Sequence, residues 1–381
     1  MEMSELKVIP QTGCPRILFF SGGTALRATS RELIRYTSES VHVITPFDSG
    51  GSSAVIRRAF NMPAVGDIRN RLMALADLSR PGGRAIFALF TYRFSKKEPQ
   101  SELLDELRRM VEGRHVLVDY LADDLRRVVC AHLEFFLQRM PEDFDLRGAS
   151  IGNLVLTAGY LDTERNLAPV IDAFSSLARV RGVVRPVVDA DLHMAAELED
   201  GSVVVGQHLL TGKEAPPLSS PIKRIWMTDS LDSAEPVVRK VDPEVRIMIE
   251  RADCICYPVG SFYSSVVANL LPMGVGEAVA ANPGPKMFVP NPGGDPELLG
   301  HTVLDQVKIL RRYLFQSGAP VGSSVLTTVL VDSRAEYPGG LDIAALEELG
   351  VTVRDLPLFT EDSQPMFAPT LLAKALLFPA C

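Results

Sequence analysis

A short apolar run that ends in a Gly-rich polar loop recurs along this chain, and this pattern constrains the fold more than any other feature. Copies occupy residues 16–24, 41–53 and 252–265. Each loop leads into a segment whose apolar residues recur at helical spacing. Strand, loop and helix in this order are typical of an open parallel sheet, in which ligands lie beyond the carboxyl ends of the strands. The sequence therefore predicts a Rossmann-like α/β fold with a mostly parallel sheet flanked by helices.

The second copy carries the densest polar chemistry. Its loop places the carboxylate of Asp48 beside two glycines and three hydroxyls, in the order Asp48-Ser49-Gly50-Gly51-Ser52-Ser53. Paired glycines let backbone N–H groups turn toward an anion, and Ser52 or Ser53 is expected to cap the helix that follows. We interpret the loop as a phosphate cradle, with Asp48 as the candidate metal ligand.

A further polar cluster, Gly66-Asp67-Ile68-Arg69-Asn70, begins the next predicted helix. Asp67 suits a helix N-terminus, and Arg69 offers a planar fork that binds phosphate through two hydrogen bonds. Either cluster alone is more often an ordinary loop, but their recurrence in one chain favours a shared site. The loop at residues 21–24 lacks both the GxGxxG fingerprint and the GK[ST] ending, which argues against a nicotinamide enzyme or a P-loop ATPase.

Charge and hydropathy exclude several classes of partner. The chain has 39 basic and 47 acidic residues, a net charge of -8, which argues against broad binding to nucleic acid or to anionic membranes. Its N-terminal residues contain no long apolar segment, and no apolar run reaches about 18 residues. We expect a cytoplasmic protein without a membrane partner. Cys254 and Cys256 would share one face of a strand and are expected to be buried apolar packing residues. With Cys14, Cys130 and Cys381 they make an odd number without a metal-ligand framework, which fits a reducing compartment.

The whole chain, residues 1–381, is interpreted as a single α/β domain. Residues 95–145 combine helical periodicity with many charges and are predicted to be a helical insertion. Residues 189–220 are predicted to be a small strand and loop insertion; the Asp189, Asp191 and His193 group within it could hold a metal, although a solvated turn is favoured. Residues 85–90 are interpreted as a buried strand, and residues 355–381 as an extended C-terminal arm.

Four motifs together resemble one known family. They read FSGGTALR, VITPFDSGGSSAVIRRAFNMPAVGDIRN, IGNLVLTAGYL and ADCICYPVGSFYSSVV. In this series the chain is similar to the 2-phospho-L-lactate transferase (CofD) superfamily, especially its YvcK-like branch, over about residues 16–315. The resemblance implies a nucleotide-containing ligand held between the loops. It also implies either magnesium-assisted phospholactyl transfer from a guanosine diphosphate-linked donor to a deazaflavin precursor or, in the YvcK-like branch, binding of UDP-sugars.

The resemblance also implies the site residues. Asp48, Arg69 and Asn153 take the catalytic positions, with Asp48 as the metal ligand for Mg²⁺. The ligand-binding positions are Gly22, Gly23, Thr24, Ser49, Gly50, Gly51, Ser52, Ser53, Asp67, Asn70, Gly152, Gly260, Ser261, Tyr263 and Ser264. Two positions depart from the family pattern: Phe47 stands where many relatives have a first aspartate, and Ala25 replaces a further loop glycine.

Two functions follow from these residues. The first is a CofD-like transferase that acts on a nucleoside diphosphate-linked donor, in which a metal on Asp48 bridges the diphosphate and Arg69 stabilises the charge on the leaving group. The alternative is a non-catalytic regulatory protein that binds a nucleotide sugar with the same loops. The sequence favours the transferase slightly and leaves the alternative open. The expected partner is a nucleoside diphosphate-linked small molecule, and a homodimer is left open.

Overall fold

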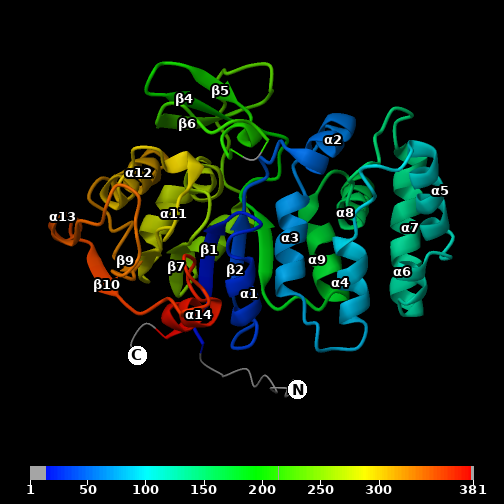
Figure 1. Ribbon diagram of the computed structural model, residues 1–381, viewed down its shortest axis with the longest axis horizontal. Coiled ribbons are helices and arrows are strands. Elements are labelled where there is room, and N and C mark those ends of the chain that lie inside the picture. Colours follow the sequence, from blue (N-terminus) through cyan, green and yellow to red (C-terminus); the bar gives the residue numbers. More distant parts are fainter. Residues whose placement is uncertain (1–13, 213, 379–381) are drawn as a thin grey trace.

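The computed structural model describes residues 14–212 and 214–378 and contains a seven-stranded sheet at its centre (Figure 1). All its neighbouring strands run parallel, in the order β10-β9-β8-β7-β1-β2-β3. The predicted fold class is confirmed. The strands are β1 (Ile17–Ser21), β2 (Val41–Ile44), β3 (Val183–Pro186), β7 (Cys254–Tyr257), β8 (Lys286–Phe288), β9 (Thr328–Val331) and β10 (Thr352–Asp355).

Helices cover the sheet and extend beyond it. In chain order the α-helices are α1 (Arg27–Leu33), α2 (Gly51–Phe60), α3 (Gly66–Leu75), α4 (Gly83–Thr91), α5 (Gln100–Val111), α6 (Val116–Asp119), α7 (Asp123–Arg139), α8 (Ile151–Asp162), α9 (Leu167–Leu177), α10 (Pro243–Glu250), α11 (Val275–Ala281), α12 (Val303–Gln316), α13 (Ile343–Glu348) and α14 (Pro369–Leu377). Within the described residues, no helix is both long and apolar enough to cross a membrane.

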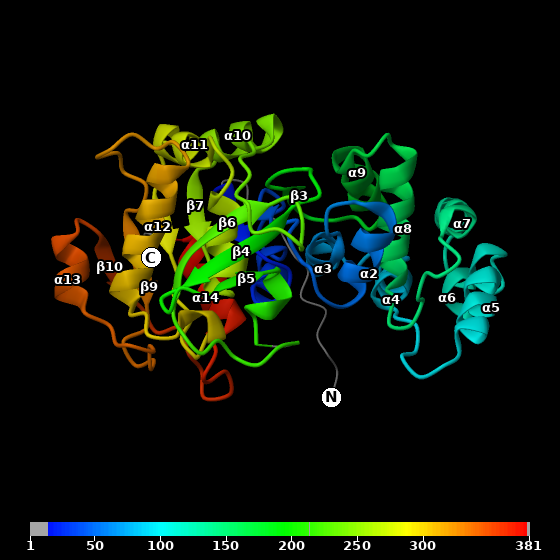
Figure 2. The same ribbon diagram turned by 90° about the horizontal axis from the view of Figure 1, so that it is seen from above.

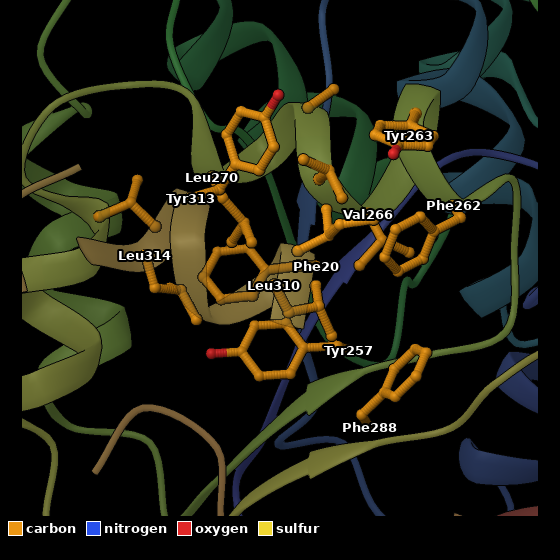
Figure 3. Close-up of a cluster of buried hydrophobic side chains, with 14 of the residues drawn as sticks. Phe20, Tyr257, Phe262, Tyr263, Val266, Leu270, Phe288, Leu310, Tyr313 and Leu314 are labelled. Carbon is orange, nitrogen blue, oxygen red and sulfur yellow. The ribbon is translucent and has the colours of Figure 1, made fainter. Parts of the chain in front are cut away.

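The central strand β1 explains why both faces of the sheet are covered. Successive side chains of a strand point to opposite faces, and all five residues of β1 are buried. Leu18 and Phe20 join one apolar cluster, which includes Tyr257 and residues of α12 (Figure 3). Ile17 and Phe19 join the cluster on the other face, to which α1 and α14 contribute. Cys254 and Cys256 of β7 are buried in this second cluster, as predicted; Cys381 lies outside the described residues.

The strand order creates a crevice beside β1. From β1 the chain proceeds through β2 and β3 toward one edge of the sheet, and later through β7 to β10 toward the other edge. The loops that follow β1 and β7 therefore diverge at the carboxyl ends of adjacent strands. In open α/β sheets such a switch point is where ligands bind.

A second, antiparallel sheet lies over this end of the molecule (Figures 1 and 2). It consists of β4 (His193–Leu198), β5 (Val203–Val205) and β6 (Ile222–Thr228), in the order β5-β4-β6. The short 3-10 helix η1 (Gln207–Leu209) follows β5. Most of this sheet comes from residues 189–220, the segment predicted as a small insertion. This small sheet brings residues that are distant from the Gly-rich loops in the sequence to the crevice.

The helices α5, α6 and α7 form the segment predicted as a helical insertion, at one side of the molecule (Figure 1). The chain enters and leaves the insertion through two antiparallel stretches. The Phe94 N–H donates to Ala149 O at 3.0 Å, and the backbones of Arg93 and Ser150 form an isolated antiparallel β-bridge. We call these stretches, residues 92–96 and 145–151, the stem ribbon. The stem ribbon therefore connects the helical insertion with one wall of the crevice.

The prediction of a strand at residues 85–90 is wrong, because they lie in α4. Ile86, Leu89 and Phe90 are buried at helical spacing, while Arg84 is exposed. A short apolar run fits a buried strand or a buried helix equally well, and here the packing decides for the helix. The C-terminal segment packs on the body through the helix α14, which contacts α1.

Candidate functional site

A cavity of about 840 Å³ opens at the carboxyl ends of β1, β2 and β7. This volume is within the range of small-molecule and cofactor sites. The loops after these three strands meet there with the beginning of α3. The residues predicted from the sequence that line it are Gly22, Gly23, Thr24, Asp48, Gly50, Gly51, Ser52, Ser53, Asp67, Arg69, Asn70, Asn153, Gly260, Ser261 and Ser264.

Three predicted site residues lie behind the cavity wall and support it. Ser49 is buried, and its Oγ is 2.8 Å from Nδ1 of His208, which itself lines the cavity. At Gly152, a Cβ would lie 2.8 Å from the Cδ of Arg69. The hydroxyl of Tyr263 donates to the Ile222 carbonyl at 3.0 Å. These three residues therefore pack behind the wall and do not line the cavity.

The N-terminus of α2 faces the cavity without a side-chain cap. The expectation that Ser52 or Ser53 caps this helix is wrong, because Gly50 is the N-cap residue and both serines lie in the first turn. The first N–H groups of a helix have no intrahelical partner and carry partial positive charge. Glu214 reaches over this turn: a Cβ on Gly50 would lie 2.7 Å from its Oε1. The helix therefore offers N–H donors to an anion, next to the acidic side chain of Glu214.

Asn153 contributes a second polar group at the same place. It is completely buried, and its Nδ2 donates to the Ser52 Oγ at 3.3 Å. Its Oδ1 has no hydrogen-bond partner in the part of the chain that is described. A buried carbonyl oxygen without a partner costs free energy. A ligand donor or a cation would satisfy it.

Arg69 is almost enclosed but weakly bound by the protein. It is 4% exposed, its Nη1 reaches the Phe90 carbonyl only at 3.5 Å, and its Nε has no hydrogen-bond partner among the described residues. Burial, together with the neighbouring Arg93, lowers the pKa of Arg69 to about 10, although Asp67 opposes this shift. The guanidinium remains charged at neutral pH, and much of its hydrogen-bonding capacity is left for an anion.

Arg71, two residues further along α3, has a different role. Its side chain is fully buried, and its Nη2 donates to the Gly22 carbonyl at 2.6 Å and to the Ser21 Oγ at 3.3 Å, while Nη1 donates to Ser30 Oγ. These bonds connect α3 with β1, α1 and the first Gly-rich loop. Arg71 thus holds in place the first Gly-rich loop, which lines the cavity.

The loop after β7 differs from the expected pattern. Its residues Gly260, Ser261, Tyr263 and Ser264 are predicted to bind a ligand, but carboxyl groups of this chain already accept several backbone N–H groups of the loop. Asp295 accepts from the Phe262 N–H at 2.8 Å, and Glu297 accepts from the N–H groups of Tyr263 and Ser264 at 2.9 and 2.8 Å. This loop therefore shapes the cavity through Ser261 and Ser264 and leaves anion binding to the other loops.

Glu297 predicts a pH dependence of stability. Burial, helped by Asp295, raises its pKa to about 8 from an ordinary value of 4.5. Between these values the folded state binds more protons than the unfolded state, so its contribution to stability falls as pH rises. We expect the urea midpoint of the wild type to fall more between about pH 5 and pH 8 than that of Glu297→Gln, which cannot ionise. Equal changes in both proteins would contradict this origin.

The side chains available for a metal are few. Phe47 is fully buried in the core, and Asp48 accepts from the Gly50 N–H through Oδ1 at 3.1 Å. No group of three or more acidic, His or Cys side chains suited to a metal ion is present in residues 14–212 and 214–378. Magnesium is often held by one or two carboxylates together with substrate phosphates. Asp48, with Asn153 Oδ1 as a neutral oxygen, fits only an ion held mainly by a ligand's phosphates.

The small sheet is connected to the second Gly-rich loop through Arg57. This buried side chain donates to the carbonyls of Phe47 and Asp48 at 3.3 and 3.1 Å and pairs with Asp191 at 2.6 Å. Asp191 is thus an ion-pair partner. Burial, more than the adjacent Arg57, lowers the pKa of His193 to about 4, which leaves it neutral.

Sequence reasoning missed several cavity residues. They are Arg93, Lys96, Asp145, Arg147, Gln207, His208 and Glu214. All lie in the stem ribbon or after β5, more than twenty residues from the nearest Gly-rich loop in the chain. Gln207 and His208 follow a strand end, but nothing in the sequence shows that the small sheet lies over the crevice.

Comparison with known proteins agrees with this architecture. The model of the family described as 2-phospho-L-lactate transferase CofD matches residues 17–359. The gluconeogenesis factor of Bacillus subtilis is 28% identical over 89% of each chain, and that of Listeria monocytogenes is 27% identical over 95% of each. A crystal structure of a UPF0052 family protein from Bacillus halodurans, 24% identical, covers 96% of this chain and 100% of its own with a TM-score of 0.70, which shows the same fold.

Proposed function

This chain belongs to the 2-phospho-L-lactate transferase CofD family, and from this premise we propose that it is a regulatory protein whose cavity binds a nucleoside diphosphate-linked small molecule, with uridine diphosphate sugars as the first candidates. One observation carries the proposal. The uncapped N-terminus of α2 and the buried, weakly bonded Arg69 face the same cavity. Both favour a negatively charged group, and a helix N-terminus is a common phosphate site.

Two observations favour binding over phospholactyl transfer. The side chain of Phe47 lies in the core, so the second Gly-rich loop supplies the carboxylate of Asp48 alone. The relatives that match nearly the full length of this chain are named gluconeogenesis factors, which suggests a role in carbon metabolism. In this proposal the loops hold the diphosphate, and occupancy of the site is the signal.

A thermal-shift screen tests the proposal. A ligand that binds only the folded state raises the melting temperature. We expect uridine or guanosine diphosphates and their sugar derivatives to raise it, with larger shifts than the monophosphates give. The absence of a shift with every nucleotide at millimolar concentration would overturn the proposal.

The transferase is the second candidate, because Asp48 and Asn153 converge. Asp48 Oδ2 and Asn153 Nδ2 lie 3.5 and 3.9 Å from the point where a Gly66 Cβ would be. With the unpartnered Asn153 Oδ1, this pair could orient a magnesium ion on a ligand's phosphates. When bound, such an ion would neutralise charge on the diphosphate.

Asp48→Asn separates the two candidates. The change keeps the shape of the side chain and removes its charge. For the regulatory protein we expect the affinity for UDP-glucose to be unchanged or up to about tenfold higher, because repulsion from the diphosphate is relieved. For a magnesium-dependent transferase, donor consumption would collapse and binding would lose its magnesium dependence. Calorimetric titrations with and without magnesium, together with a phosphorus NMR assay of the donor, measure both.

A further inference from the structure

The stem ribbon places a second arginine at the cavity. Arg93 lies just after α4, where the chain enters the helical insertion. Its Nη1 donates to the Gly148 carbonyl at 3.0 Å and to the Ser52 Oγ at 3.1 Å. These two bonds account for both hydrogens of Nη1, and within the described part of the chain the Nε and Nη2 hydrogens of the guanidinium remain as donors. Arg93 lines the same cavity as Arg69.

The Ser52 hydroxyl indicates where an anion would lie. Its oxygen accepts from Arg93 Nη1 and from Asn153 Nδ2. A hydroxyl has two acceptor lone pairs and one hydrogen, and both lone pairs are in use here. The hydrogen is therefore free to be donated, from the first turn of α2, to an acceptor in the cavity.

Two cations at one wall require a compensating charge. Arg69 is nearly enclosed, and the proximity of Arg93 makes its charged form less favourable. The two guanidinium groups thus repel each other, and Asp67 opposes this effect on Arg69. An anion between them would reverse this balance and would also receive the Ser52 hydroxyl and the N–H groups of α2.

We propose that Arg93 and Arg69 form a clamp for the diphosphate, with Ser52 as its third donor. The helical insertion is then part of the binding site, because its stem carries one arm of the clamp. This inference rests on the proposed function and specifies which side chains distinguish a diphosphate from a monophosphate. Two arginines and a helix N-terminus favour the more highly charged ligand.

The test uses the full chain and matched substitutions. Wild type, Arg93→Gln, Arg93→Lys and the control Arg84→Gln are titrated with UDP, GDP, UMP and inorganic pyrophosphate, and the melting temperature of each protein is measured. Arg84 is exposed on α4, the helix that precedes Arg93, and does not line the cavity. It therefore controls for loss of an arginine from this part of the surface.

We expect Arg93→Gln to weaken binding of the diphosphates and pyrophosphate by about tenfold or more, and binding of UMP by less. Arg93→Lys should recover part of the loss, and Arg84→Gln should match the wild type. The melting temperature of Arg93→Gln should stay within about 2 °C of the wild type, because the side chain is exposed and repulsion is removed.

Two outcomes would overturn the clamp. Wild-type affinity for diphosphates in Arg93→Gln would show that Arg93 does not contact them. An equal loss of affinity for UMP and UDP, with a lower melting temperature, would show that Arg93 only holds the ribbon in place. If the wild type binds none of the four ligands, the proposed function itself fails; if it binds them but Arg93→Gln is unaffected, only the clamp fails.

Discussion

Arg69→Gln is expected to weaken binding of a nucleoside diphosphate by about 10- to 150-fold, or roughly 1.5–3 kcal/mol, the range for a charged hydrogen bond. The side chain is 4% exposed, and within residues 14–212 and 214–378 its Nε has no hydrogen-bond partner. Glutamine retains much of the aliphatic stem that packs beside Gly152 but removes the charge and the fork of donors. Calorimetric titration of UDP into both proteins measures the difference.

The stability of the Arg69→Gln variant without ligand provides a control for this prediction. Because burial and Arg93 both disfavour the charged form of Arg69, its replacement by a neutral side chain should cost little stability in the absence of ligand. A variant that binds UDP as well as the wild type would show that Arg69 is structural. A variant that binds weakly and also unfolds early would point to a disturbed cavity wall instead.

Arg71→Ala is expected to lower the free energy of unfolding by about 2–5 kcal/mol, because it deletes a large buried side chain and leaves its neutral hydrogen-bond partners without a donor. The substitution leaves the Gly22 carbonyl, 2.6 Å from Nη2 in the native protein, without this donor. It also removes the donors to Ser21 and Ser30 and leaves a cavity between α1, α3 and β1.

Urea unfolding of Arg71→Ala, with Arg84→Ala as the control, measures this effect. Arg84 is exposed, so its replacement should change stability by no more than about 0.5 kcal/mol. A loss below about 1 kcal/mol in Arg71→Ala would mean that the network around the first loop contributes little, and that this loop is held mainly by its backbone.

The parallel sheet could be predicted because its signals are local. Residues 16–24 and 41–53 show a buried strand, a Gly-rich break and helical spacing within about a dozen residues. The alternation of Ile17 and Phe19 with Leu18 and Phe20 then requires cover on both faces, which the helices provide. The apolar run at residues 85–90 was ambiguous for the same reason: its signal is local, and only packing distinguishes a buried helix from a strand.

The site could be predicted only where its residues belong to the recognised motifs. The motifs directly predict Asp48, Ser52 and Arg69. In contrast, Arg93 lies in the stem ribbon and His208 lies next to the small sheet, and the placement of both segments at the cavity depends on long-range packing. The loop after β7 shows the opposite case. Its sequence is that of an anion site, and only the structure shows that Asp295 and Glu297 already accept its N–H groups.

The most direct test of the central claim is a calorimetric titration of the full wild-type chain with UDP-glucose, with and without magnesium, in which phosphorus NMR follows the ligand throughout. We predict saturable binding to one site per chain and an intact ligand after prolonged incubation, because the cavity offers donors for a diphosphate but the second Gly-rich loop supplies a single carboxylate. The absence of binding by UDP-glucose and by its guanosine counterpart would contradict the account. Steady consumption of the bound ligand in the presence of magnesium would also contradict it and would restore the transferase.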